Sequence, residues 1–368
     1  MDTAEKLAYV VRSPTEEVLT EEDLRVLFDE GRAIDHYIGF EISGLIHLGT
    51  GLMAGAKIAD FQKAGITCRI FLADWHAWIN NKLGGDMDTI RKVAVGYFKE
   101  GMAVSVRMMG GDPDKVRYIL GSELYADDPD YWATVINVSK NLTLARVRKS
   151  ITIMGRQQQE DVNFAQLIYP PMQVADIFSQ DLTLVHSGID QRKAHVIARE
   201  VAPKIGRDKP VAVHHKLLLG LNQPPVWPVE KSQMRELLSQ MKMSKSIPKS
   251  AVFIHDSPEE VREKLRLAFC PAGNIDFNPV LDWAQSLLFR NEGFALEVSR
   301  PAKFGGDVVY PTFESLQTAF AAGELHPMDL KKAVAEALTQ LLEPARDLFA
   351  QPRHAAMLEE LREIKVTR

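Results

Sequence analysis

The sequence is poor in cysteine. Only Cys68 and Cys270 occur among its 368 residues, far apart and in apolar surroundings. Two such cysteines do not make a disulfide framework or a zinc site, so we expect buried free thiols in a reducing compartment.

Long apolar runs are also absent. No stretch reaches the roughly 18 residues that a membrane-spanning helix needs. Residues 1–28 are acidic and helix-like, and they lack the basic and apolar regions of a secretory signal peptide. We therefore expect a cytoplasmic protein without a membrane partner.

The chain has no excess of positive charge. Its 44 Lys and Arg residues against 49 Asp and Glu residues give a net charge of −5 at pH 7. Nucleic-acid-binding domains tend to be basic, so this balance argues against an RNA partner unless cations are concentrated locally. Cations do gather in four short segments, although each alone would also fit a solvated helix face or loop. The segments hold Arg146, Arg148 and Lys149; Arg192 and Lys193; Lys242, Lys245 and Lys249; and Lys331 and Lys332.

What the sequence does contain is typical of a soluble globular protein, with 46% hydrophobic and 25% charged residues. A chain of this length exceeds the usual size of a single core, so we expect two domains. Apolar strand candidates alternate with helical segments, and this predicts an α/β fold with a doubly wound, Rossmann-like parallel sheet. The strands are expected at 36–42, 67–78, 115–124, 182–190 and 209–215.

Helices are predicted from apolar periodicity and capping residues. Residues up to 33 predict one or two amphipathic helices that begin at "SPTEE" and "LTEED". A helix of about 17 residues should follow "EISGLIHLGT". Another is expected to begin at "YPPMQ", with its two prolines in the first turn. The remaining helices of this part are expected at 87–109, 129–154, 158–168 and 191–206.

These segments divide the chain into successive parts. From about residue 255 the pattern becomes strongly helical, which predicts a mainly α-helical C-terminal domain. The parts are an N-terminal helical segment (1–33), a Rossmann-like domain (34–222) with a helical insertion at about 110–168, a linker with a lysine-rich loop (223–254), and the C-terminal domain (255–368).

Polar side chains stand where the predicted strands end. In open parallel sheets, ligands bind at the carboxyl ends of the strands. The residues in question are Tyr37 with Glu41, Asp74 with His76, the segment 187–191, and His214 with His215.

The segment "EISGLIHLGTGL" follows the first of these strands and begins a helix. Unpaired N–H groups and a partial positive charge make a helix start attractive to phosphate. His47 and Thr50 lie on one face of the first turn and could donate to phosphate or ribose oxygens, while Gly44 and Gly49 permit close approach. The alternative is an ordinary cap by Ser43 or Thr50 with His47 on the surface.

The loop "KMSKS" favours the phosphate hypothesis. Lys242 and Lys245 form a cationic clamp that would stabilise the charge developing on a leaving pyrophosphate. A five-residue match can arise by chance, but here it occurs with an "HLGT" helix start in an α/β chain.

Together these motifs resemble those of the class I aminoacyl-tRNA synthetases. "IHLGT" is similar to the HIGH signature of that family, and "KMSKS" matches its second signature in full. The chain resembles more closely the archaeal and eukaryotic type of tyrosyl-tRNA synthetase, through "YIGFEISGLIHLG", "FLADWHAW", "YPPMQVADI", "GIDQRKAHVIARE", "FCPAGN", "RPAKFGGD" and "ELHPMDLKKAV". The last signature position is Thr50 rather than histidine, so it cannot carry positive charge.

The resemblance implies a pocket for tyrosine. Tyr37 and Asp176 would meet the phenol hydroxyl, and Tyr169, Gln173 and Gln191 would meet the α-amino group. Tyr169, Gln173 and Asp176 are spaced i, i+4 and i+7, so one helix face can present all three.

The resemblance also implies a site for ATP. Tyrosine would react with ATP to give tyrosyl-adenylate, with Mg²⁺ arriving on ATP and no tightly bound cofactor or protein metal site. His47, Thr50, Lys242 and Lys245 would be the catalytic residues. The ATP-binding residues would be Gly39, His47, Gly49, Thr50, Lys242, Met243, Ser244, Lys245 and Ser246.

The partners implied are tRNA(Tyr), L-tyrosine, ATP and a second copy of the chain. The acceptor stem would contact Arg192 and Lys193, with Arg146, Arg148 and Lys149 nearby. The anticodon would contact Phe304, His326 and Asp329, in the C-terminal domain, through stacking and base-edge contacts. Without the resemblance, "KFGGD" would fit a simple turn and "HPMDL" a helix cap.

Three alternatives remain open from the sequence. Tryptophanyl-tRNA synthetases share this architecture, although Tyr37 with Asp176 suits a phenol better than an indole. A non-catalytic tRNA-binding paralogue is the second, and the intact Lys242, Ser244 and Lys245 argue against it. A nucleotidyltransferase for a smaller substrate is the third, and it would not need a C-terminal helical domain.

Overall fold

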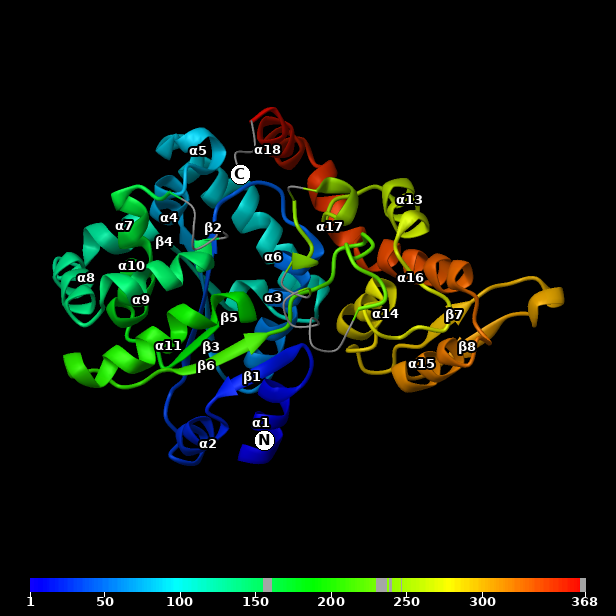
Figure 1. The fold of residues 1–368 in the computed structure, drawn as a ribbon, viewed down its shortest axis with the longest axis horizontal. Helices are drawn as coiled ribbons and strands as arrows, with labels where there is room; N and C mark the ends of the chain where they lie inside the picture. The colour runs from blue at the N-terminus through cyan, green and yellow to red at the C-terminus, as the bar shows by residue number, and fades with distance from the viewer. Residues whose placement is uncertain (155–160, 230–236, 238–239, 246, 365–368) are drawn as a thin grey trace.

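The computed structural model describes residues 1–154, 161–229, 237, 240–245 and 247–364. A six-stranded sheet forms the centre of its larger part, in the order β1-β6-β5-β2-β3-β4 (Figure 1). The five strands from β2 onward are parallel, and β1 pairs antiparallel with β6. The strands are β1 (Thr15–Leu19), β2 (Asp35–Glu41), β3 (Thr67–Ala73), β4 (Val116–Leu120), β5 (Leu184–Gly188) and β6 (Val211–His215).

Helices cover both faces of the sheet. Alternate residues of a strand point to opposite faces, and here Ile38 of β2 packs in the core with α3 and α6, whereas Tyr37 packs in a second core with α10 and α11. This confirms the predicted α/β fold with a doubly wound sheet. The helices of this part are α3 (Leu48–Lys63), α4 (Asp74–Ile79), α5 (Met87–Val93), α6 (Lys99–Met108), α7 (Gly121–Asp127), α8 (Tyr131–Lys140), α9 (Leu144–Ser150), α10 (Phe164–Ser179) and α11 (Arg192–Val201).

The chain order of the strands reverses at β2. The crossover from β2 leads to β3 on one side, and the later strand β5 pairs on the other side. Such a switch point opens a crevice at the carboxyl ends of the two strands, where ligands of doubly wound folds bind.

The region after residue 255 is mainly helical, as predicted, and lies to the right in Figure 1. It also contains a short antiparallel pair, β7 (Leu296–Val298) with β8 (Val308–Tyr310), which was not predicted. Its helices are α13 (Pro258–Leu267), α14 (Pro279–Trp283), α15 (Phe313–Ala321), α16 (Pro327–Leu341), α17 (Glu343–Ala350) and α18 (Pro352–Glu363).

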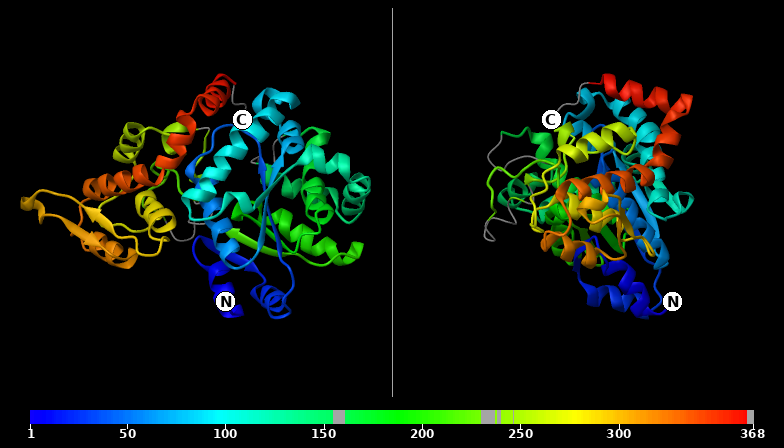
Figure 2. Two further views of the ribbon diagram at one scale, coloured as in Figure 1. Left: turned by 180° about the vertical axis from the view of Figure 1, so that it is seen from behind. Right: turned by 90° about the vertical axis from the view of Figure 1, so that its right-hand side faces the viewer.

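The last two helices return to the Rossmann-like part. α17 and α18 lie beside the helices α5 and α6 in Figures 1 and 2. The ring of Phe349 on α17 lies 5.2 Å from that of Tyr97, and Met357 on α18 approaches Gly96. The parts of the chain before and after residue 255 therefore share packed side chains.

The N-terminal prediction was half wrong. Thr20 caps α2 (Glu21–Asp29) as "LTEED" predicted, and α1 (Thr3–Val11) precedes it. "SPTEE" does not begin a helix, because residues 15–19 pair with β6 as the edge strand β1. Thr15 donates its hydroxyl to Val10 O instead of capping a helix.

The expected helices at 158–168 and from Tyr169 are wrong in their boundaries. A single helix, α10, starts at Phe164 under a capping box of Asn163 and Gln166, and residues 158–160 lie outside the described residues. Pro170 and Pro171 consequently lie inside the helix, where they leave two carbonyls without intrahelical donors.

Three further boundaries differ from the predictions. The expected strand 67–78 ends at Ala73, and its polar end forms α4. The helix 87–109 contains a π-helical segment at Ala94–Phe98, where Gly96 departs from helical geometry. The helix 129–154 is divided between α8, α9 and the 3₁₀ turn Ile151–Met154.

No helix among the described residues is long and apolar enough to cross a bilayer. Both cysteines are unpaired. Cys68 is buried as expected, whereas Cys270 is only partly buried, so a buried free thiol is confirmed for Cys68 and not for Cys270.

Candidate active site

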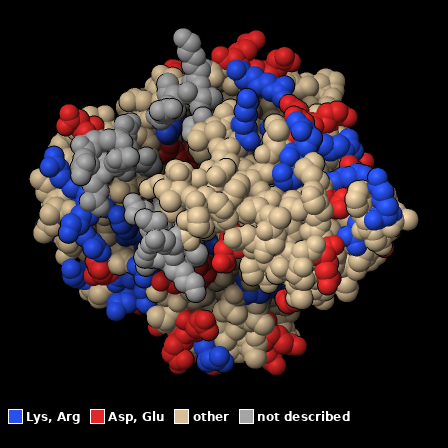
Figure 3. Space-filling view, turned by 45° about the vertical axis from the view of Figure 1, so that its right-hand side comes forward, with Lys and Arg blue, Asp and Glu red and all other residues tan. Residues whose placement is uncertain are grey.

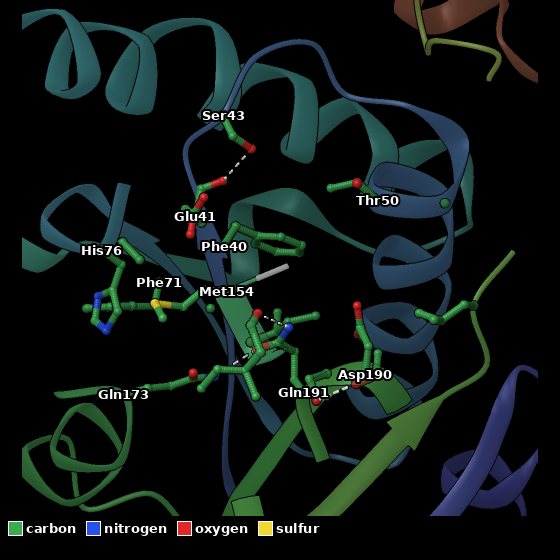
Figure 4. Close-up of a pocket in the computed structure, with 18 of the residues that line it drawn as sticks. Phe40, Glu41, Ser43, Thr50, Phe71, His76, Met154, Gln173, Asp190 and Gln191 are labelled. Atoms are coloured by element: carbon green, nitrogen blue, oxygen red, sulfur yellow. Dashed lines mark hydrogen bonds between the residues drawn. The ribbon is translucent and has the colours of Figure 1, made fainter. Parts of the chain in front are cut away.

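A cavity of about 340 Å³ opens at the switch point of the sheet. Its wall contains all the side chains predicted for tyrosine and for ATP except Ser246, which lies outside the described residues. Figure 4 shows its two ends, with His76 and Gln173 on one side and Thr50 and Asp190 on the other. The predicted residues in the wall are Tyr37, Gly39, His47, Gly49, Thr50, Tyr169, Gln173, Asp176, Gln191, Lys242, Met243, Ser244 and Lys245.

Asp176 is a buried carboxylate with one oxygen held and the other left open. The hydroxyls of Tyr125 and Tyr131 donate to its Oδ1 at 3.0 and 2.8 Å. Oδ2 is buried without a hydrogen bond from any described residue, 3.7 Å from His76 Nε2. Burial raises the pKa of Asp176 to about 8, and the two hydroxyl bonds offset this only in part. At pH 7 most of Asp176 is therefore in the neutral form. A ligand hydroxyl, which can both donate and accept, can supply the hydrogen bond that Oδ2 lacks.

A second carboxylate, the half-buried Glu41, lies at the end of β2. Tyr169 donates its hydroxyl to Glu41 Oε2 at 3.1 Å, and Lys82 Nζ lies 3.5 Å from Oε1. Burial raises the pKa of Glu41. Beside it, Gln173 Nε2 donates to Gln191 Oε1 at 3.4 Å, so these two amides form one polar wall. This group offers acceptors to a cationic amine.

His47 is itself the N-cap of α3. Its Nδ1 accepts from the Thr50 N–H at 3.2 Å, and the Thr50 hydroxyl lies 3.3 Å from Nε2. Burial lowers the pKa of His47 to about 3, so the ring is neutral as the cap requires. The alternative of an ordinary cap is therefore right in kind, but the capping residue is His47 rather than Ser43 or Thr50, and His47 is buried.

The lysine loop lies across the cavity from this helix start. Lys242 Nζ pairs with Asp190 Oδ2 at 2.6 Å, and Lys245 Nζ donates to Ser43 Oγ at 2.9 Å. Backbone bonds fix the loop, with Met243 N–H donating to Leu218 O at 2.8 Å. Burial lowers the pKa of Lys245 to about 8. Two cations thus face a helix N-terminus across the cavity, an arrangement suited to a polyphosphate.

The chain continues from the loop to the start of α3. Phe253 forms an antiparallel bridge with His47, and the N–H of Ile254 donates to Ile46 O at 3.1 Å. Backbone pairing therefore holds the chain that follows the lysine loop against the first signature segment.

The basic residues predicted for an acceptor stem come together on α9 and α11. Lys193 Nζ donates to Lys149 O at 3.0 Å, which joins the two helices. Arg146 pairs with Glu200 and Arg192 with Glu17. Figure 3 shows Lys and Arg side chains gathered on the left and at the upper right of one face, with carboxylates at the bottom.

The residues predicted for an anticodon lie away from the cavity, in the C-terminal part. Phe304 is 60% exposed, and Lys303 Nζ lies 4.9 Å from the centre of its ring. His326 caps α16 by accepting from the Met328 N–H, with Asp329 in the first turn, so the helix-cap alternative describes the unbound geometry. Arg300 bonds both Gly306 O and Glu324 O, which ties the two segments together.

Sequence reasoning missed three residues of the site. Tyr125 and Tyr131 orient Asp176 from helices that precede it by 51 and 45 positions, and no local pattern marks them. Asp190 was noted only as part of a polar strand end, yet it holds Lys242.

The comparisons with known proteins agree with this geometry. The family model for class I tRNA synthetases (W and Y) matches residues 29–343. The chain belongs to the class I tRNA synthetases. This confirms the family and the fold class predicted from the sequence.

The synthetase is similar over its whole length to archaeal proteins. It is 62% identical to a tyrosine–tRNA ligase of Thermococcus gammatolerans, with 100% of both chains covered. It is 60% identical to tyrosyl-tRNA synthetase from Pyrococcus horikoshii, whose crystal structure holds L-tyrosine, with a TM-score of 0.95 over 99% of this chain and 100% of that one. Tryptophanyl-tRNA synthetase from Aeropyrum pernix shares the fold, at 18% identity and a TM-score of 0.66 over 95% of this chain and 85% of that one.

Proposed function

We propose that this synthetase is a tyrosine–tRNA ligase. It activates L-tyrosine with ATP to tyrosyl-adenylate and pyrophosphate, and then transfers the tyrosyl group to the 3′ end of tRNA(Tyr). The observation that carries the proposal is Asp176, whose Oδ2 is buried beside the cavity without a hydrogen bond from the described chain. The full-length similarity to tyrosine–tRNA ligases supports it.

Asp176 and Tyr37 select the phenol. A tyrosine hydroxyl forms a hydrogen bond with Asp176 Oδ2, whereas phenylalanine leaves this buried atom without a partner. Tyrosyl-tRNA synthetases are the reference case for such rejection, at about 10⁵-fold against phenylalanine, a value that belongs to the enzyme class rather than to the present geometry.

The polar wall holds the amino-acid end. The ammonium group of tyrosine donates to the acceptors of Tyr169, Gln173 and Gln191, and Glu41 supplies negative charge behind them. This orients the substrate carboxylate toward the start of α3 and the lysine loop, where the nucleotide binds.

The chemical step needs positioning and charge more than a covalent nucleophile. A carboxylate oxygen of tyrosine bonds to the α-phosphorus, the bond from that phosphorus to the bridging oxygen breaks, and pyrophosphate leaves with the electron pair. Lys242 and Lys245 stabilise the leaving group. Gly39, Gly49 and the N–H groups at the start of α3 hold the rest of the nucleotide, together with the residues of the loop from 242 to 246.

Mg²⁺ enters as part of the ATP substrate. It coordinates phosphate oxygens and keeps several waters. Among the described residues, no cluster of three His, Cys, Asp or Glu side chains could hold a metal ion.

The tRNA binds along two surfaces. Arg192, Lys193 and the basic residues of α9 face the acceptor stem, and Phe304, His326 and Asp329 face the anticodon. The exposed ring of Phe304 suits stacking on an unpaired base. These reactions belong to the cytoplasm.

A homodimer is part of the proposal. Large apolar side chains are exposed on neighbouring helices, and Trp78 and Trp132 both contact the ring of Trp75. Contiguous exposed apolar surface marks an interaction site. The exposed residues are Trp78, Trp132, Ile136, Leu144 and Phe164.

Light scattering tests this assembly. Ile136, 60% exposed on α8, is replaced by Glu, and the exposed Val309 on β8 is replaced by Glu as the control. We expect a dimer for the wild type and for Val309→Glu, and a monomer for Ile136→Glu. A monomeric wild type would contradict the assembly.

Amino-acid-dependent exchange of pyrophosphate into ATP tests the proposed reaction without tRNA. We expect exchange with tyrosine and none above background with phenylalanine or tryptophan. Exchange with tryptophan would support the alternative synthetase, and no exchange with any amino acid would support the non-catalytic paralogue. Charging of tRNA(Tyr) then tests the second step.

A further inference from the structure

Five of the ten histidines are buried in or against the sheet, in two hydrogen-bonded groups. The first group, named the histidine chain here, runs across three neighbouring strands from His36 on β2 through His186 on β5 to His215 on β6. His36 Nε2 lies 3.3 Å from His186 Nδ1, and His186 Nε2 lies 2.7 Å from His215 Nδ1. The second group joins His195 of α11 to His214 at 3.0 Å.

The histidine chain lies on the face of the sheet that α3 covers. The ring of Phe61 on α3 packs 4.8 Å from His36 and 5.2 Å from His186. Burial lowers the pKa of His36 to about 3 and that of His215 to about 4, and it lowers the pKa of His186 well below its usual value. All three imidazoles are therefore neutral at physiological pH, and each carries a single N–H.

Because each ring carries one N–H, the ring protons can be placed in two ways that preserve both hydrogen bonds. In the first, every ring carries its proton on Nε2, His36 donates to His186, and His186 donates to His215. In the second, every ring carries its proton on Nδ1, and the direction is reversed. Both arrangements satisfy the two internal hydrogen bonds, so only the groups at the two ends of the chain can distinguish them.

The buried end decides between them. His36 Nδ1 is buried and has no hydrogen-bond partner among the described residues. The second arrangement would bury an N–H there without an acceptor, and such orphaned donors are rarer in proteins than acceptors without donors. The first arrangement is therefore favoured, and it places the N–H of His215 on Nε2.

The other end of the chain lies at the cavity. His215 and Gly188 both line it, and a methyl group on Gly188 would lie 3.6 Å from His215 Nε2 and 2.8 Å from Asp190 Oδ1. A donor and a carboxylate acceptor thus lie close together in the cavity wall beside Gly188, next to the side chain of Leu217. Lys242 pairs with Oδ2 of Asp190, so Oδ1 remains an acceptor on this side. A fully ionised phosphate has no proton to donate to it, whereas a hydroxyl can donate to Asp190 and accept from His215.

We infer that His215 Nε2–H donates to a ribose hydroxyl of the bound nucleotide, and that His186 and His36 are positioning residues that hold His215 in this tautomer. The inference rests on the proposed function, since it takes ATP as the nucleotide. In the second group, His195 and His214 lie on the opposite side of the sheet and make no hydrogen bond to the histidine chain within the described part of the molecule.

The tautomer is measured first, on the protein without substrate. Long-range ¹H–¹⁵N correlation spectra of ring-labelled histidine distinguish the two nitrogens, and the signal of His215 is assigned with His215→Gln. We expect a neutral ring protonated on Nε2. A ring protonated on Nδ1, or a charged ring at pH 7, would overturn the inference whatever the activity.

The second measurement is kcat/KM for ATP, 2′-deoxy-ATP and 3′-deoxy-ATP in tyrosine-dependent pyrophosphate exchange. We expect His215→Ala to lower the preference for ATP over one deoxy analogue by about 3–10-fold, the value of one neutral hydrogen bond. His215→Gln, whose amide nitrogen can take the place of Nε2, should keep most of the preference. Equal preference in His215→Ala and the wild type would overturn the inference.

His186→Phe and His195→Phe form a matched pair, since each replaces one buried, hydrogen-bonded histidine by a ring of similar size. We expect His186→Phe to mix the tautomers of His215 and to reduce the ribose preference, and His195→Phe to change neither. The same loss of preference in both variants would show a merely structural role. A wild type without tyrosine-dependent exchange would refute the proposed function and leave the tautomer result standing.

Discussion

Lys245 places a half-buried, titratable cation in the cavity wall, beside Ser43. Its pKa is lowered by burial to about 8, so the side chain is charged at pH 7 and loses its proton as the pH rises above 8. In the proposed site, the charged form binds ATP. We predict that kcat/KM for ATP, which reports the free enzyme, falls as the pH increases from 8 to 9.5.

Lys245→Arg is the control for this prediction. A guanidinium stays charged over the whole range, so the decline above pH 8 should be absent or greatly reduced. Ionisation of the substrates affects both enzymes equally. If the two pH profiles fall in parallel, the decline does not come from Lys245.

Individual residues of the site could be predicted where a local sequence pattern, such as helical spacing, identifies them. The spacing of Tyr169, Gln173 and Asp176 on one helix face was readable, and the structure places all three at the cavity. Tyr125 and Tyr131 could not be predicted from the sequence, because their contact with Asp176 depends on how α7 and α8 pack against α10. The neutral cap formed by His47 was likewise set by burial, which the local sequence does not show.

At the scale of elements, α3 and α6 pack unusually closely through glycines. A methyl group on Gly55 would lie 2.6 Å from the backbone oxygen of Ser105, which cannot move without displacing α6. We predict that Gly55→Ala lowers the free energy of unfolding by about 1–3 kcal/mol, the usual cost of overpacking. Denaturant unfolding measures this.

Gly101→Ala is the matched control on the facing helix. Its added methyl group would meet the side-chain ends of Ile46 and Ile254, which can rotate away. The higher helix propensity of alanine, up to about 1 kcal/mol, should then offset most of the cost. Equal losses in the two variants would contradict the argument from backbone contact.

Elements were predictable where periodicity acts alone, and less so where pairing partners are distant in sequence. "SPTEE" has the composition of a helix start, but β6 offers its edge nearly 200 residues later, and the ladder with β1 prevails. The capping box of Asn163 and Gln166 marks the start of α10 in the sequence. The prediction instead followed the two prolines and placed the start too late.

At the scale of the molecule, one buried carboxylate joins three parts of the chain. Asp60 on α3 accepts from Lys57 at 3.0 Å, from Arg290 of the C-terminal part at 2.7 Å, and from Arg12 near the N-terminus. Lys57 and Arg290 are almost fully buried. We predict that Asp60→Asn destabilises the protein by about 3–5 kcal/mol, because it leaves buried cations without their counter-ion.

Thermal unfolding followed by calorimetry checks this prediction. Glu263→Gln, which removes a surface pair with Arg266, is the control and should leave the transition unchanged. Because Asp60 connects all three parts, we expect one transition in the wild type. A transition for Asp60→Asn that coincides with the wild type would contradict the structural role.

The central claim is that Asp176 selects tyrosine by its hydroxyl. Pyrophosphate exchange with tyrosine and with phenylalanine, measured on the wild type, Asp176→Asn and Asp74→Asn, tests it most directly. Asp74 is also a fully buried carboxylate, but it does not line the cavity. We predict that Asp176→Asn lowers kcat/KM for tyrosine about 10–100-fold, the usual cost of leaving a buried polar group without its partner, and that it does not lower the residual rate with phenylalanine. Asp74→Asn should retain the selectivity. Unchanged preference for tyrosine over phenylalanine in Asp176→Asn would contradict the claim.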